Sequence, residues 1–279
     1  MQHIKCGKYK LEIYKRTYVM GILNLSPDSF YAGSSYSDIE KAVNRAHEMV
    51  GQGADIIDVG GESTRPGSEP LTTEEEIKRV IPVVEKLLDE IKVPISVDTY
   101  KVEVAERALE IGAHIINDIY GLRTEGMAEL ISKYDVPVVI MHMQGTPKDM
   151  QKNPQYKYVI KEIISFLKER AKFAEKSGIK SDKIIIDPGI GFGKTTGHNL
   201  KIIKNLGKFK SLGYPILIGV SRKSFIGNIL NLGPEERLEG TLAAISISIM
   251  NGANILRVHD VKEAVRASRI ADAILKVNK

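Results

Sequence analysis

The stretch PISVDTYKVEVAERALEIGAHIINDI, residues 94–119, contains two short apolar runs separated by one amphipathic segment. The runs, Pro94–Thr99 and His114–Ile119, are rich in Val and Ile without a clean polar alternation, which is typical of parallel strands buried on both faces. The segment between them, Lys101–Ile111, is followed by Gly112, a residue that commonly ends helices. The stretch therefore predicts a strand, a helix and a second strand.

The same alternation continues along the chain in both directions. Further helices are predicted over Tyr156–Lys176, Glu235–Met250 and Val261–Val277, and a capping box with an acidic first turn predicts a helix start at Thr72–Glu76. Eight strand–helix units with right-handed crossovers predict one α/β domain over residues 1–279, a closed parallel (β/α)₈ or TIM barrel. The eight runs are Tyr18–Leu23, Asp55–Gly61, Pro94–Thr99, His114–Ile119, Pro137–Met143, Ile184–Ile190, Pro215–Ser221 and Ile255–Asp260.

The residues before the first run predict a separate small element. Ile4–Ile13, around Gly7, are expected to form a short β-hairpin within residues 1–16 that covers the floor of the barrel. The length of 279 residues suits a single barrel, which typically takes about 250 residues. No Pro/Gly/Ser-rich linker divides the chain, so we expect one domain.

Composition narrows the possible partners. One cysteine, Cys6, excludes an intrachain disulfide and suits a reducing compartment. The chain has no apolar run near the roughly 18 residues that a membrane helix needs, and no signal-peptide core. The net charge of +5 comes from dispersed lysines, and aromatic residues are only 6% with no Trp, so a basic stripe for nucleic acid is not expected. We expect a cytoplasmic protein with neither membrane nor nucleic acid as partner.

Polar side chains gather where the predicted strands end. A lone Asp at such a position is as often structural as functional, and Asp118 and Asp260 are expected to be structural, with Asp58 in a supporting role and His142 as a packing residue. Eight strands ending this way together predict an active site at the carboxyl ends of the barrel strands. The strand-end residues are Asn24, Asp58, Asp98-Thr99, Asn117-Asp118, His142, Gln144, Asp187, Ser221–Ser224, Arg257 and His259.

Two other patterns need separate interpretation. The glycine-rich run Gly189–Thr195 fails both nucleotide-binding motifs, because Pro188 and Lys194 stand where each would need glycine, and it predicts a tight turn. No His/Cys/carboxylate set has zinc spacing, and no nucleophile-elbow motif is present. The long loops Ser26–Ser37 and Glu62–Leu71 have the composition of mobile lids.

The sequence resembles the dihydropteroate synthase family over nearly the whole chain from Tyr18 onward. Residues 20–30, MGILNLSPDSF, resemble its first signature and residues 58–67, DVGGESTRPG, its second. Two departures are Ser26, where the family usually has Thr, and Tyr100, where a small residue is more usual. The resemblance continues through Ser96–Thr99, Ile116–Asp118, Met141–Gly145, Asp187–Gly189, Ser221–Ser224 and Arg257–Asp260.

The resemblance implies an enzyme of folate biosynthesis. p-Aminobenzoate would displace diphosphate from 6-hydroxymethyl-7,8-dihydropterin diphosphate to give 7,8-dihydropteroate. The resemblance also implies Mg²⁺ as cofactor, competition by sulfonamides, and a homodimer formed through the late helices.

The chemistry of the substrates suggests which residues would bind them. A pterin edge presents two adjacent N–H donors, which a carboxylate such as Asp187 pairs with, while Lys223 can donate to ring acceptors. The expected pterin-binding residues are Asp98, Asn117, Ile119, Met141, Asp187 and Lys223; Ile119 and Met141 are equally expected as core. Those expected for diphosphate are Asn24, Arg257 and His259, with Asn24 also the ligand of the metal. Those expected for p-aminobenzoate are Phe30, Thr64, Arg65, Pro66 and Ser224. The expected catalytic residues are Asn24, Arg65, Asp98, Lys223, Arg257 and His259.

Two alternative functions share the pterin site. A pterin-binding methyltransferase domain would have no reason to keep the residues for diphosphate and p-aminobenzoate. An inactive pterin-binding protein should have lost them, and here they remain. We expect the pterin substrate to bind before p-aminobenzoate, with Arg65 acting only once the lids close.

Overall fold

Eight parallel strands form the centre of the molecule. The computed structural model describes residues 3–25, 36–63 and 67–277. The strands are hydrogen-bonded in the order β8-β7-β6-β5-β4-β3-β10-β9, and a parallel bridge between Ile186 and Ile216 joins the two ends of the sheet. The predicted (β/α)₈ barrel is confirmed. The strands are β3 (Tyr18–Asn24), β4 (Ile56–Gly60), β5 (Ile95–Asp98), β6 (Ile115–Asp118), β7 (Val138–Met141), β8 (Ile184–Asp187), β9 (Leu217–Ile218) and β10 (Ile255–Val258).

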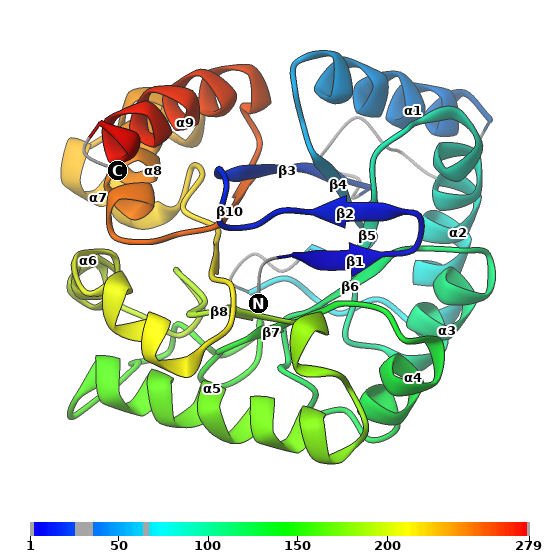
Figure 1. Cartoon of the computed structure of the whole chain (residues 1–279), viewed down its shortest axis with the longest axis horizontal. Helices are drawn as coiled ribbons and strands as arrows, with labels where there is room; N and C mark the ends of the chain where they lie inside the picture. Colours follow the sequence, from blue (N-terminus) through cyan, green and yellow to red (C-terminus); the bar gives the residue numbers. More distant parts are fainter. Residues whose placement is uncertain (1–2, 26–35, 64–66, 278–279) are drawn as a thin grey trace.

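Helices surround the strands, as Figure 1 shows. The capping box predicted before α2 is present, with Thr72 accepting from the backbone N–H of Glu75 and the Glu75 carboxylate accepting from that of Thr72. None of the described helices is long and apolar enough to cross a membrane. The helices are α1 (Tyr36–Gly51), α2 (Thr73–Glu90), α3 (Val102–Glu110), α4 (Met127–Tyr134), α5 (Val159–Lys176), α6 (Thr196–Lys204), α7 (Ser224–Leu230), α8 (Leu238–Met250) and α9 (Val261–Lys276), with 3₁₀ turns η1 (Ser181–Lys183), η2 (Leu206–Leu212) and η3 (Pro234–Glu236).

Alternate strand residues serve two apolar layers. In β8, Ile184 and Ile186 belong to the large core between strands and helices, while Ile185 belongs to the smaller core inside the barrel. Because both faces of each strand are buried, the strands need apolar side chains at every position, which explains the continuous Val/Ile runs.

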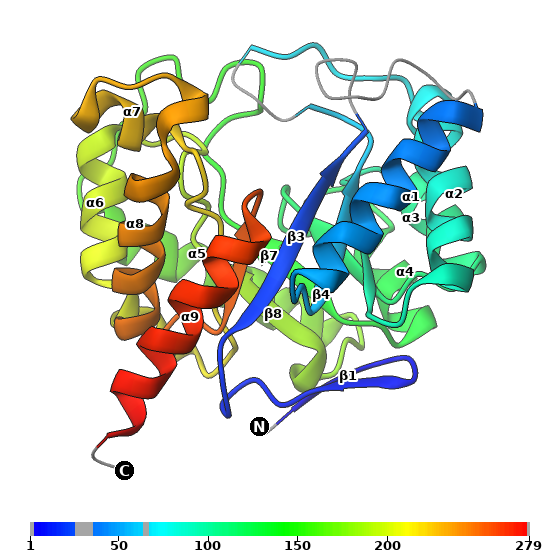
Figure 2. The same ribbon diagram turned by 90° about the horizontal axis from the view of Figure 1, so that it is seen from above.

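The predicted N-terminal hairpin is also confirmed. Strands β1 (Ile4–Cys6) and β2 (Tyr9–Leu11) pair antiparallel around Gly7. Ile4, Cys6 and Leu11 pack on the inward residues of the barrel strands and so close its floor. Figure 2 shows the hairpin at the end of the barrel opposite to the one at which the arrow of β3 points. The carboxyl ends of the strands therefore remain available for a site.

Candidate active site

The inward-facing positions of the strands change from apolar to polar toward their carboxyl ends. Side chains alternate along a strand, so Ile56 and Asp58, Ile115 and Asn117, and likewise Ile185 and Asp187, share the inward face. The isoleucine of each pair lies in the core inside the barrel, on the side of the hairpin. Asn24, Asp98, Met141 and Arg257 also face inward, near the carboxyl ends of their strands. One rule of strand geometry thus brings together residues spread over more than 200 positions.

Asp58 binds two of these side chains directly. Its Oδ2 accepts from Arg257 Nε at 2.6 Å and from Asn117 Nδ2 at 3.0 Å. A second guanidinium nitrogen of Arg257, Nη2, donates to Asp98 Oδ2 at 2.6 Å. Asp58 is fully buried, and a buried carboxylate requires such partners. With its amide nitrogen bound to Asp58, Asn117 keeps Oδ1 as an acceptor for a ligand.

Asp98, which pairs with Arg257, differs from an ordinary surface carboxylate. Burial raises the pKa of Asp98 to about 7, against the opposing effect of Arg257 and with a further increase from Asp58. Burial lowers the pKa of Arg257, but Asp58 and Asp98 raise it by more, so the guanidinium stays charged. Among the hydrogen bonds of the described residues, none uses Arg257 Nη1.

Asp187 ends β8, and Lys223 follows β9, which lies between β8 and β10 in the barrel. Asp187 Oδ1 accepts from the backbone N–H of Gly189 at 2.7 Å, and burial raises its pKa to about 6. The Lys223 ammonium lies 4.3 Å from the centre of the Phe192 ring. Burial and the charge of Arg257 lower the Lys223 pKa to about 8, against Asp187, which raises it. Both side chains can therefore change charge near neutral pH.

Lys194 is a buried part of this region that sequence reasoning missed. Its amine donates to the carbonyl of Phe192 at 2.8 Å and contacts His142 Nδ1 at 3.0 Å. Burial and Lys194 lower the pKa of His142 to about 2, so this histidine is neutral, as a packing residue should be. The predicted tight turn is present after β8, with positive φ at Gly189, Gly191 and Gly193. A lysine within a glycine-rich turn after a barrel strand was the feature of the sequence that could have indicated this buried amine.

His259 is held by Ser221. The backbone N–H of His259 donates to Ser221 Oγ at 3.2 Å, and His259 Nδ1 lies 2.9 Å from the same oxygen. While Ser221 Oγ accepts from the backbone, it can donate its own proton to Nδ1, and in that arrangement the ring proton lies on Nε2. Burial, Arg257 and Arg222 lower the His259 pKa to about 3. His259 is therefore neutral, and in this arrangement it can donate through Nε2.

The two aspartates expected to be structural have structural contacts. Asp118 accepts from the backbone N–H groups of Tyr120 and Leu122, at 2.7 and 2.6 Å. Asp260 holds Arg222 through two contacts of 2.9 and 2.6 Å. Arg222 has a φ of 55°, an uncommon conformation that this pairing supports.

An apolar cluster lines the same end of the barrel. Ile119 and Met141 are both 3% exposed and belong to it, which places them beside the polar residues and outside the main core. The other members are Met143, Met150, Phe192, Tyr100 and Tyr120.

Four residues expected to bind p-aminobenzoate, namely Phe30, Thr64, Arg65 and Pro66, lie outside the described residues. The predicted lid Ser26–Ser37 lies largely outside them too. Ser224, the fifth, is the first residue of α7 and is exposed.

Magnesium has few possible ligands here. The described residues include no group of three or more His, Cys, Asp or Glu side chains that could hold a metal ion. Asn24 offers one amide oxygen at the end of β3, and Asp98 beside it is paired with Arg257. Such a sparse set fits Mg²⁺, which usually keeps several waters and is shared with substrate phosphates.

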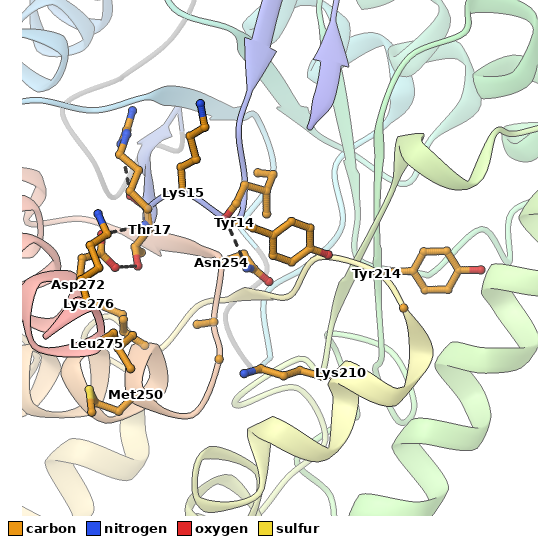
Figure 3. Close-up of a pocket in the computed structure, with 16 residues that line it drawn as sticks. Tyr14, Lys15, Thr17, Lys210, Tyr214, Met250, Asn254, Asp272, Leu275 and Lys276 are labelled. Carbon is orange, nitrogen blue, oxygen red and sulfur yellow. Dashed lines mark hydrogen bonds between the residues drawn. The ribbon is translucent and has the colours of Figure 1, made fainter. Parts of the chain in front are cut away.

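A surface cavity of about 370 Å³ lies at the opposite end of the barrel. Figure 3 shows Tyr14, Thr17, Lys210 and Asp272 around it, between the hairpin connection and the ends of α8 and α9. Asp272 is engaged by the backbone N–H and hydroxyl of Thr17. This cavity contains none of the predicted site residues.

Comparison with known proteins shows the family to which the chain belongs. The family model described as "Pterin binding enzyme" matches residues 20–259, and the chain belongs to this family. A dihydropteroate synthase of Clostridium beijerinckii is 49% identical over 275 residues, which cover 98% of this chain and 100% of the relative. Within the family, the chain therefore groups with the dihydropteroate synthases.

Two solved structures are similar over the whole chain. Yersinia pestis dihydropteroate synthase in a sulfonamide drug complex has a TM-score of 0.94 and 41% identity, covering 99% of this chain and 100% of that one. The Xanthomonas albilineans enzyme in complex with 7,8-dihydropteroate has a TM-score of 0.88 and 37% identity, with the same coverage. The agreement extends to the arrangement of the complete barrel.

Proposed function

We propose that this enzyme condenses 6-hydroxymethyl-7,8-dihydropterin diphosphate with p-aminobenzoate, releasing diphosphate and forming 7,8-dihydropteroate for folate biosynthesis. The observation that carries the proposal is the convergence of Asp187, Asn117 and Lys223 beside an apolar cluster at the carboxyl ends of the strands. The similarity to an enzyme solved with 7,8-dihydropteroate supports the same product.

The pterin would be held by complementary hydrogen bonds. Asp187 keeps Oδ2 for the adjacent N–H donors of the pterin edge, because Oδ1 is used by Gly189. Asn117 would accept through Oδ1, and Lys223 would donate to ring acceptors. Ile119 and Met141 would contact the ring face.

The diphosphate would lie nearer β3 and β10. His259 would donate through Nε2 and Arg257 through Nη1, at the part of the fold that commonly binds phosphate. Asn24 would hold Mg²⁺ together with the phosphate oxygens, and the ion would neutralise part of their charge.

The proposed chemistry needs little proton transfer before the bond forms. An arylamine attacks as the neutral amine, so no residue is required as a general base. We expect the bond between the pterin methylene carbon and the diphosphate oxygen to break first, after which the arylamine nitrogen forms the new C–N bond with the resulting cation and loses a proton. His259, Arg257 and Asn24 would stabilise the charge that develops on diphosphate, and Asp98 would stabilise positive charge on the pterin.

We also propose a homodimer formed by the late helices. Ile247 and Met250 on α8 are 51% and 47% exposed, and Ile270 and Ile274 on α9 are 66% and 56% exposed. Exposed apolar side chains gathered on two adjacent helices indicate a protein contact. A second copy would bury them.

The decisive assay measures diphosphate release from the pterin substrate with and without p-aminobenzoate, in the presence and absence of Mg²⁺. The proposal expects release coupled to dihydropteroate formation, dependent on both substrates and on Mg²⁺. Methyl transfer from methyltetrahydrofolate to a corrinoid protein, without condensation, would instead favour the methyltransferase alternative. Pterin binding without either reaction would favour an inactive pterin-binding protein.

A further inference from the structure

The glycine-rich turn after β8 lies directly against the end of β7. A Cβ at Gly189 would meet the carbonyl oxygen of His142 at 2.0 Å, and one at Gly193 would meet that of Gln144 at 2.6 Å. The backbone N–H of His142 donates to the carbonyl of Asp187 at 2.9 Å. The two glycines therefore let the turn approach the backbone that follows β7 more closely than a side chain would permit.

Lys194 connects this turn to β7 through hydrogen bonds. Its Nζ donates to the carbonyl of Phe192 at 2.8 Å and to that of His142 at 3.3 Å, and it lies 3.0 Å from His142 Nδ1. An ammonium has three N–H donors, and these three acceptors use all of them when the ring proton of His142 is on Nε2. Lys194 is only 3% exposed. It can therefore act on a ligand only through its neighbours.

The turn positions two groups of the proposed pterin site. Asp187 precedes it and accepts from the backbone N–H of Gly189 at 2.7 Å. Phe192, whose carbonyl binds Lys194, has its ring 4.3 Å from the Lys223 ammonium. A displacement of the turn would therefore move both the carboxylate proposed to pair with the pterin donors and the ring beside Lys223.

Lys194 also adds positive charge to this region. Burial raises the pKa of Asp187, and the charges of Lys223, Lys194 and Arg257 each oppose that rise. Burial lowers the pKa of Lys194 to about 7, with a further decrease from Lys223, while Asp187 raises it. His142, the titratable group in contact with Lys194, stays neutral because burial lowers its pKa to about 2. Lys194 is thus charged in the acidic range in which Asp187 titrates.

We propose that Lys194 is a positioning residue of the pterin site, which holds the turn after β8 against β7 and supplies part of the positive charge around Asp187. It touches no substrate. The run Gly189–Thr195, which matches no nucleotide-binding motif, thereby serves the pterin substrate. This inference rests on the proposed function, since it concerns the first substrate of that reaction.

The test measures the Kd of the pterin diphosphate by calorimetry at pH 6 and at pH 7.5, together with the thermal midpoint. Lys194→Met keeps much of the side-chain length but loses the charge and the donors. Binding requires ionised Asp187, and loss of a nearby cation raises the pKa of a carboxyl group. The Kd of Lys194→Met should therefore increase about tenfold at pH 6 and only a few-fold at pH 7.5. Lys204→Met, at the exposed last residue of α6, should match wild type at both pH values.

Two results would overturn the proposal. One is an unchanged Kd at both pH values in folded Lys194→Met. The other is a Kd that rises by the same factor at both, which would indicate a role in packing alone. If Lys194→Met fails to fold, Lys194→Gln, which loses the charge but keeps a donor, decides by the same comparison. Failure of the proposed function is distinct, because wild-type protein would then release no diphosphate with p-aminobenzoate.

Discussion

At Asp187, the burial that prepares a carboxylate for a ligand also destabilises the folded chain. Its pKa is raised to about 6 from 3.8, so folding favours the protonated form. Stability from this group is therefore greatest at low pH and is lost as pH rises through the window between the two values. The penalty at neutral pH is on the order of 3 kcal/mol, and a ligand that pairs with the carboxylate would offset it.

Asp187→Asn should separate binding from stability. The amide keeps an oxygen for the Gly189 N–H but loses the charge, so thermal stability should rise at pH 7.5. Pterin affinity should fall by about 2–4 kcal/mol, because the two N–H donors lose a charged acceptor. Calorimetric titration and thermal unfolding measure the two effects. Asp89→Asn, at an exposed position on α2, should change neither. Unchanged pterin affinity in Asp187→Asn would remove Asp187 from the site.

Pterin affinity should have a bell-shaped pH dependence. Asp187 must be ionised to accept, and its pKa of about 6 predicts roughly tenfold weaker binding at pH 5 than at the plateau. Lys223 must be protonated to donate from its ammonium, and its pKa of about 8 predicts a second decline above that pH. Titrations across pH 5–9 check both limbs. Asp187→Asn should lose the acidic limb and move the basic limb to lower pH, because the Asp187 charge raises the Lys223 pKa. A surviving acidic limb would assign it to another group.

The inward polar residues were predictable individually, but their pairing was not. Arg257 was expected to bind diphosphate, yet its contacts to Asp58 and Asp98 join positions 199 and 159 residues apart in the sequence. Such pairs depend on how the barrel closes, which local patterns do not specify. Glu62 appeared in the sequence only as part of a signature. Its contacts with the Tyr100 hydroxyl at 2.9 Å and with Lys101 Nζ at 2.6 Å could not be predicted from it.

At the scale of elements, the strands were predictable because burial on both faces leaves continuous apolar runs. The run Pro215–Ser221 is an instructive exception, since only Leu217–Ile218 form strand β9. Ile216 forms only the isolated bridge to Ile186, and Val220 is buried without strand pairing. Hydrophobicity alone does not distinguish these states from a full strand. The hairpin, the capping box before α2 and the turn after β8 followed from local chemistry.

The turn after β8 should tolerate no side chain at Gly189. A Cβ there would lie 2.0 Å from the carbonyl oxygen of His142, and the φ of +70° is unfavourable for other residues. Gly189→Ala should therefore destabilise the protein by at least about 2 kcal/mol and weaken pterin binding through Asp187. Gly197→Ala is the matched control, because that glycine lies in α6 with space around it, and alanine should stabilise by about 0.5–1 kcal/mol. Denaturant unfolding measures both. Equal stabilities would mean that the turn is not constrained as the structure indicates.

At the scale of the whole molecule, the two ends of the barrel differ in the chemistry of their side chains. The hairpin seals the amino-terminal end with apolar side chains, and the carboxyl-terminal end collects the ionisable groups. The exposed apolar residues of α8 and α9 lie on the outer ring of helices (Figure 1). Self-association there would leave Asp58, Asp187 and Arg257 inside their own barrel. Association and catalysis should therefore be separable.

Ile247→Asp combined with Ile270→Asp tests that separation. The pair places two charges among the apolar side chains that a second copy would bury, so desolvation should oppose association. Light scattering should show wild type at twice the monomer mass and the double variant at the monomer mass. Leu200→Asp, at a 44% exposed position on α6, should remain dimeric. Pterin affinity should stay within about twofold in all three proteins, because none of the changed residues faces the barrel interior. A monomeric wild type would contradict the dimer, and a double variant that remains dimeric would place the contact elsewhere on the surface.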